Sequence, residues 1–128
     1  MPAHSAFDYA VLRVVPRVDR EEFVNAGVIL FAPTEGFLGC ELAWDARRLA
    51  ALAPDADTAE ITRHLDSFRD ICAGAPAGGP IARLPPSERF HWLVAPRSTV
   101  IQTSPVHAGL AEDPRAALRR LVETMVAR

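Results

Sequence analysis

Residues 7–15 limit the possible folds of this chain more than any other segment, because they are apolar on both of their faces. The segment is rich in aromatic and branched side chains and stops at Pro16, which is typical of a β-strand. Alternate residues of an extended chain share a face, so one face carries Phe7, Tyr9, Val11, Arg13 and Val15, and the other carries Asp8, Ala10, Leu12 and Val14. Two apolar faces need cover on both sides, and we therefore expect a central strand of a packed sheet.

Two more strands follow after short connections. Residues 21–32 run from two glutamates into an apolar stretch, and the "PTEG" at 33–36 has the proline and glycine of a turn. Residues 37–43 then return antiparallel. Three consecutive strands with short links predict a β-meander.

Helices are predicted after the meander from capping residues and apolar spacing. Asp45 precedes a short helix that Pro54 stops, and Asp57 with Glu60 fits a capping box before a longer helix. Gly74 is placed to end that second helix.

The C-terminal half is less regular. Residues 75–86 form a loop rich in proline and glycine, and residues 87–95 fit both a helix and a strand, with the helix preferred. Residues 98–104 read as a strand that Pro105 ends, and Asp113 begins a final helix with an apolar stripe. This order predicts an α+β fold with an antiparallel sheet of about four strands and helices packed mainly on one face. We expect residues 1–128 to be a single globular domain.

Composition narrows the function only slightly. The net charge of −2 predicts no broad attraction to nucleic acids or anionic membranes. All 14 basic residues are arginines, so arginine abundance by itself points to no function. Cys40 and Cys72 have no metal-ligand spacing and are expected in the core. The first 20 residues have no long apolar stretch and no run reaches the length of a membrane span, so we expect a cytoplasmic protein.

The first candidate binding site consists of Arg13, Glu22 and Asn25. In a regular strand Glu22 and Asn25 point to opposite faces, but Gly27 is typical of a bulge that would change this. Because the link between the first two strands is short, we expect Arg13 to contact Glu22. The alternative is structural, with Glu22 at an exposed strand start and Asn25 satisfying backbone groups at the irregularity.

The second candidate site consists of Arg97, Ser98, Thr99 and His107. A guanidinium beside two hydroxyls suits a phosphate or carboxylate, and His107 has the chemistry of a general acid or base. We expect Arg97 and His107 to flank one depression, which requires the chain to reverse sharply at Pro105. The alternative is that Ser98 and Thr99 bond the local backbone.

Stronger signals of chemistry are missing from the sequence. It contains no glycine-rich phosphate loop, no HExxH or GxSxG motif and no EF-hand spacing. The histidines lack metal-ligand spacing, so no metal site is expected, and no cofactor or reaction is indicated.

The motifs resemble those of an uncharacterised family of small bacterial proteins, a domain of unknown function. The matching pattern comprises Tyr9, Leu12, Arg13, Pro16, Glu22, Phe23, Asn25, Gly27, Val28, Arg97, Ser98, Thr99, Pro105, Val106, His107 and Gly109. Members are often encoded beside HipA-like kinases, so the resemblance implies such a kinase, or another cytoplasmic protein, as a partner. Its polar positions coincide with the two candidate sites above.

The sequence is therefore consistent with two functions. The first is a non-enzymatic binding or regulatory partner module, with a HipA-like kinase as the implied partner. The second is a small enzyme or binding protein for phosphate or nucleotides, in which Arg13, Glu22, Asn25, Arg97 and His107 act together. The second requires the two polar clusters to share one cleft.

Overall fold

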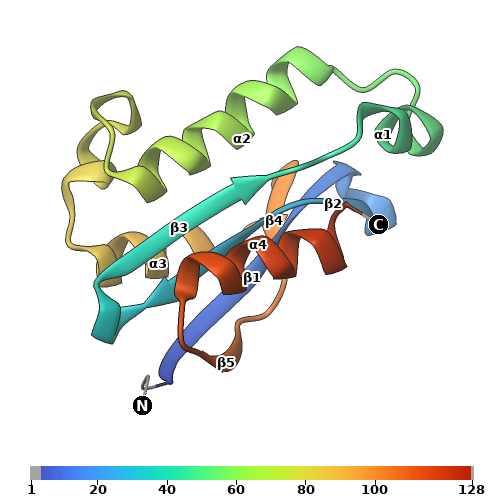
Figure 1. Cartoon of the computed structure of the whole chain (residues 1–128). Coiled ribbons are helices and arrows are strands. Elements are labelled where there is room, and N and C mark those ends of the chain that lie inside the picture. The colour runs from blue at the N-terminus through green and yellow to red at the C-terminus, as the bar shows by residue number, and fades with distance from the viewer. Residues whose placement is uncertain (1–3, 128) are drawn as a thin grey trace.

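The computed structural model describes residues 4–127 and has an α+β fold, as the sequence predicts (Figure 1). An open antiparallel sheet of five strands is packed with four α-helices within these residues. The elements are β1 (Ser5–Arg17), β2 (Glu22–Ala32), β3 (Phe37–Leu42), α1 (Ala46–Leu52), α2 (Thr58–Ala73), α3 (Pro86–Val94), β4 (Ile101–Thr103), β5 (His107–Ala111) and α4 (Pro114–Met125). The ambiguous segment is helical, and the N-terminal meander is confirmed.

The strand order is β3-β2-β1, with β4 and β5 both on the far edge of β1. β1 has 13 residues and is long enough to pair with both, through Leu12–Val14 with β4 and Ser5–Tyr9 with β5. β5 was not predicted from the sequence, because its residues "HAGLA" have weak strand propensity. The length of β1, rather than local preference, makes this segment a strand.

Both faces of the sheet are covered, which explains why β1 is apolar on both. On one face Leu12, Val14 and Ile29 pack against side chains of α1, α2 and α3 such as Leu65 and Leu93. The other face carries a second core, in which Leu118 and Val122 of α4 pack against Phe7, Val28 and Leu30 of the sheet. Three helices thus share one face, as predicted, and α4 covers the opposite one.

An irregularity in β2 decides where its polar residues point. Leu12 pairs with Gly27 but Arg13 pairs with Asn25, so Ala26 is the extra residue of a β-bulge. Beyond the bulge the alternation of faces is inverted, which places Asn25 on the face of α4. Gly27 is required here, because a Cβ at this position would lie 2.6 Å from the carbonyl oxygen of Glu41. The bulge that Gly27 predicted is confirmed.

The predicted helix N-caps are present. The side chains of Asp45, Asp57 and Asp113 accept hydrogen bonds from the backbone N–H groups of Arg47, Glu60 and Arg115. Gly74 ends α2 in the left-handed conformation with φ of 69°. Within residues 4–127, the helices are all too short or too polar to cross a lipid bilayer.

Candidate functional site

The first predicted cluster is only partly assembled. Arg13 and Asn25 lie opposite each other in the β1–β2 register and share the α4 face. The side chain of Asn25 is committed to the fold, because its Nδ2 atom donates a hydrogen bond of 3.0 Å to the carbonyl oxygen of Met125. That carbonyl belongs to the last turn of α4, where backbone oxygens lack helical partners. Asn25 thus anchors the end of a helix.

Glu22 does not join this pair, so the predicted contact with Arg13 is wrong. Glu22 lies opposite Arg17 at the strand start and forms an exposed ion pair with Arg20. The guanidinium of Arg13 instead lies over the ring of Phe23, 4.1 Å from its centroid. The strand register causes this outcome, because Arg13 lies opposite Asn25 and not opposite Glu22. Asn25 is three residues further along β2 than Glu22, and the side chains of Arg13 and Glu22 lie on opposite faces of the sheet.

Arg97 also belongs to a helix end. Its Nη1 atom donates a 2.8 Å hydrogen bond to the carbonyl of Leu93, and its Nη2 atom donates a 2.7 Å bond to that of Trp92. The guanidinium lies 5.0 Å from the ring centroid of Phe68 and 4.9 Å from that of Trp92. Partial burial lowers the pKa of Arg97 from its usual value. The positive charge of Arg97 therefore stabilises the negative, C-terminal end of the α3 dipole.

His107 lies far from Arg97, so the predicted shared depression is wrong. β4 and β5 both run antiparallel to β1, so they run in the same direction and the chain does not reverse at Pro105. Ile101 lies opposite Val14 and His107 lies opposite Tyr9, five strand residues further along, or about 16 Å. The ring of His107 packs against that of Tyr9, with centroids 5.4 Å apart.

Ser98 and Thr99 line two different depressions. Thr99 bonds the backbone of Ile101, as the structural alternative predicted, and lines a depression with Arg97 and His64. Ser98 instead lines a second hollow together with Arg13. We name that second hollow the Arg13 depression, and it has a volume of about 390 Å³. It is lined by Arg13, Val15, Val18, Glu21, Phe23, Ser98 and Gln102.

Arginines at helix ends are a general feature of this fold. Arg89 donates to the carbonyls of Ile71 and Cys72 at the end of α2, and Arg48 donates to Val126 just after α4. Together with Arg97, they supply a guanidinium to the C-terminus of three helices. This arrangement satisfies orphan carbonyls and opposes the negative end of each helix dipole.

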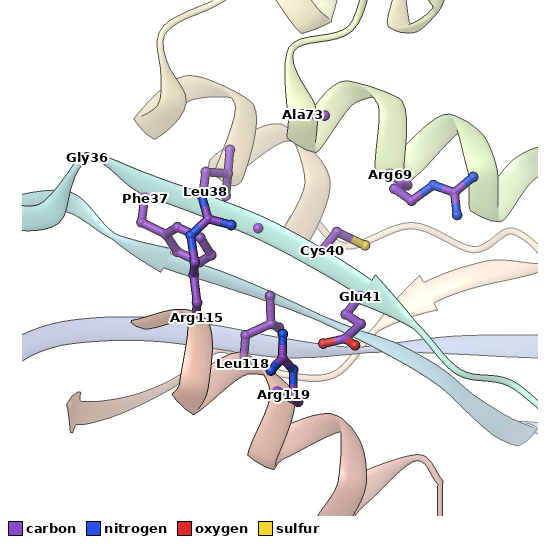
Figure 2. A pocket seen from close by; sticks show the side chains of 11 residues that line it. Gly36, Phe37, Leu38, Cys40, Glu41, Arg69, Ala73, Arg115, Leu118 and Arg119 are labelled. Carbon is purple, nitrogen blue, oxygen red and sulfur yellow. The ribbon is translucent and has the colours of Figure 1, made fainter. Parts of the chain in front are cut away.

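A further depression lies along the outer edge of β3, between α2 and α4, and has a volume of about 420 Å³ (Figure 2). We call it the β3 groove. Its residues are Gly36, Phe37, Leu38, Gly39, Cys40 and Glu41 along the strand, Arg69 and Ala73 of α2, and Arg115, Leu118 and Arg119 of α4. Figure 2 shows Arg69 above the strand and Arg115 and Arg119 below it.

The groove exposes backbone groups of β3, because within residues 4–127 this strand pairs only with β2. The N–H of Ala43 bonds the carbonyl of Ala26 at 2.9 Å. Hydrogen-bonded pairs alternate along an antiparallel ladder, so the backbones of Phe37, Gly39 and Glu41 face β2. The N–H and C=O groups of Leu38, Cys40 and Leu42 then point outward.

The charge of the groove is positive. Three arginines and one glutamate line it. Arg69 forms an ion pair of 3.0 Å with Asp66, and Arg115 lies over the ring of Phe37, 5.1 Å from its centroid. Gly39 permits this packing, since a Cβ there would lie 2.9 Å from a methyl carbon of Leu118.

The thiol beside the groove is not activated. Burial, together with the neighbouring Cys72, raises the pKa of Cys40 far above that of a free thiol, so it stays neutral at physiological pH. Within residues 4–127, no three side chains of His, Cys, Asp or Glu gather closely enough to hold a metal ion. The groove therefore offers a strand edge and fixed positive charge.

The arginines of the groove were not predicted as site residues from the sequence. Arg115 and Arg119 are one helical turn apart beside Leu118, which is a detectable signal on α4. Their grouping with Arg69 depends on β3 being the edge of the sheet, and that follows only from the strand order.

A family model described as a protein of unknown function (DUF3037) matches residues 9–126. The chain belongs to the DUF3037 family. Comparisons with curated proteins and with solved structures found no significant match. The DUF3037 match extends from β1 to the end of α4 and so includes the β3 groove and the Arg13 depression. It confirms the resemblance to a domain of unknown function.

Proposed function

We propose that this DUF3037 protein is a non-enzymatic binding module of the cytoplasm, which holds an extended acidic segment of a partner protein along β3. The observation that carries the proposal is the unpaired edge of β3 within a groove between two helices. Addition of a strand to such an edge is a common mode of peptide recognition, in which backbone hydrogen bonds provide affinity. β3 has six residues, enough for a short added strand.

The acidic character of the segment follows from the charges around the edge. Carboxylates on the α4 side of an added strand would face Arg115 and Arg119, and those on the α2 side would face Arg69. Arginine binds carboxylates with paired, charge-assisted hydrogen bonds. The like-charged arginines oppose self-pairing, because a symmetric dimer would bring three arginines of each copy together.

A binding role also agrees with how the polar residues are used. Asn25 and Arg97 hold helix ends, and the β4–β5 direction separates Arg97 from His107. The alternative of a phosphate- or nucleotide-handling enzyme needs these residues in one cleft. The family resemblance implies a HipA-like kinase as the partner. Such a kinase is the first protein in which we would look for an extended acidic segment that binds β3.

The cytoplasmic assignment is supported by the two cysteines. Cys40 and Cys72 are both free thiols that belong to or pack against the same core. Unpaired neighbouring thiols are typical of proteins from reducing compartments.

Binding of synthetic peptides, followed by fluorescence anisotropy, tests the proposal. A peptide of about eight residues that alternates Glu and Val should bind saturably, and its Lys–Val counterpart should not. Backbone N-methylation of all Glu residues, or of all Val residues, blocks one edge of the peptide strand at a time. We expect one of the two methylated peptides to lose binding and the other to keep it. Retention by both, or equal binding of the Lys–Val peptide, would reject strand addition.

A further inference from the structure

The Arg13 depression is separate from the β3 groove and lies on the part of the α4 face that α4 leaves open. Asn25, Arg13 and Gln102 form one row across β2, β1 and β4. α4 ends beside Asn25, so the helix covers β2 and β3 more than the β1–β4 side. Arg13 therefore projects from a central strand into a hollow with helix on one flank only.

Arg13 differs from the arginines that hold helix ends. Within residues 4–127 its guanidinium makes no hydrogen bond or ion pair with protein, and its Nε atom is buried without a partner. A buried donor without a partner is costly and uncommon in native proteins. The guanidinium of Arg13 lies over the ring of Phe23, which is 44% exposed.

Glu21 stands on the wall of the same depression in an unusual backbone conformation. Its φ of 54° is the one positive value among the non-glycine residues that the structure describes. This left-handed conformation favours glycine and is strained for a side chain such as glutamate. Within residues 4–127 Glu21 also forms no ion pair. Glu21 ends the short turn after β1 in this conformation, and it lines the same hollow as the guanidinium of Arg13.

We propose that the Arg13 depression binds a small zwitterion of the amino-acid class. Its carboxylate would lie against the Arg13 guanidinium and the Ser98 hydroxyl, and its ammonium group would face Glu21. The apolar side chains of Val15, Val18 and Phe23 on the wall favour an aliphatic ligand body. A volume of about 390 Å³ is within the range of small-molecule sites. A phosphate would be disfavoured by the negative charge of Glu21.

Four matched probes separate the charges of the ligand. L-Leucine carries both, 4-methylpentanoate lacks the ammonium group, 3-methylbutylamine lacks the carboxylate, and inorganic phosphate is the plain anion. Calorimetry or NMR titration of the full chain should give saturable binding of leucine, at least about tenfold tighter than that of the other probes.

Two substitutions and a control complete the test. Arg13→Gln should weaken leucine binding about tenfold or more, and Glu21→Gln should make leucine and 4-methylpentanoate bind equally. Arg47→Gln changes a highly exposed arginine outside the depression, and it should leave the affinity for leucine unchanged. Glu21→Gln keeps the test decisive if Arg13→Gln fails to fold. Absence of leucine binding to the wild-type chain, stronger binding of phosphate, or an unchanged preference in Glu21→Gln would overturn the assignment.

Discussion

The end of α3 and the β3 groove both contain arginines over aromatic rings, but the donors of these arginines are used differently. At the end of α3, the guanidinium of Arg97 is bonded to two backbone carbonyls and lies beside Phe68 and Trp92. In the groove, Arg115 belongs to the first turn of α4 and lies over the ring of Phe37. The first turn of a helix presents N–H groups instead of carbonyls. These two arginines therefore differ in whether the carbonyls of a helix end occupy their donors.

The helix dipole sharpens this contrast. A cation stabilises the C-terminus of a helix and is unfavourable at the N-terminus. Arg97 is in the stabilising location and Arg115 is in the unfavourable one. In the proposed function, the charge of Arg115 would bind a carboxylate of the partner segment.

The largest effect on stability is expected for Arg97→Gln. The change removes two charge-assisted hydrogen bonds and the aromatic contacts, and should lower the free energy of unfolding by about 2 kcal/mol. Peptide binding at the β3 groove should be unchanged. Chemical denaturation and anisotropy on the same variant measure both quantities, and a loss of peptide affinity without a loss of stability would reverse the roles assigned to the two regions.

The double variant Arg115→Gln/Arg119→Gln should behave in the opposite way. We expect about tenfold weaker binding of the Glu–Val peptide, equivalent to about 1.4 kcal/mol. The free energy of unfolding should change by less than about 0.5 kcal/mol, because loss of the Phe37 contact and relief of the unfavourable dipole interaction offset each other. Arg63→Gln/Arg120→Gln, which removes two exposed arginines outside the groove, is the charge-matched control. Equal weakening by the control would mean that net charge alone drives binding.

Asn25→Asp tests whether the hydrogen bond from Asn25 to the end of α4 is structural. Aspartate keeps the size of the side chain but removes the donor to Met125, so the free energy of unfolding should fall by about 1 kcal/mol. Denaturation above pH 6, where the carboxylate is charged, measures this difference. An unchanged midpoint would show that the hydrogen bond is dispensable and that Asn25 has another role.

The smallest effect is expected at Glu21. Glycine adopts the left-handed conformation readily, so Glu21→Gly should raise the free energy of unfolding by about 0.5 to 1 kcal/mol. Thermal denaturation shows whether Glu21→Gly raises or lowers the stability of the fold. A destabilised variant would mean that the glutamate side chain supports the turn, and the strain argument for a binding role at this residue would fail.

Local patterns predicted much of the fold. The two-sided apolar pattern of β1, the turn at Gly36 and the N-caps of the helices are short-range signals, and all of them are present. β5 escaped prediction, because it is held by the length of β1 and has little preference of its own. The bulge was correctly anticipated from Gly27, but the register it creates depends on which strand pairs with which.

The candidate site was less predictable for a related reason. Sequence reasoning recognised Asn25 and Arg97 as unusual polar residues, but it could not place the carbonyls at the ends of α3 and α4 beside them. Whether the two polar clusters share a site was left open by the sequence; in the structure Arg13 and Ser98 line one depression, whereas Arg97 and His107 do not line it. Arg69 and Arg115 come from helices far apart in the sequence and meet only because β3 is the sheet edge.

Amide hydrogen exchange along β3, with and without the Glu–Val peptide, tests the strand-addition account most directly. In the free protein the amides of Leu38, Cys40 and Leu42 point outward and should exchange quickly, while those of Gly39 and Glu41 are protected by β2. The peptide should slow exchange at the first three and leave the other two nearly unchanged. Saturable peptide binding with no added protection at Leu38, Cys40 and Leu42 would contradict the claim that β3 receives a partner strand.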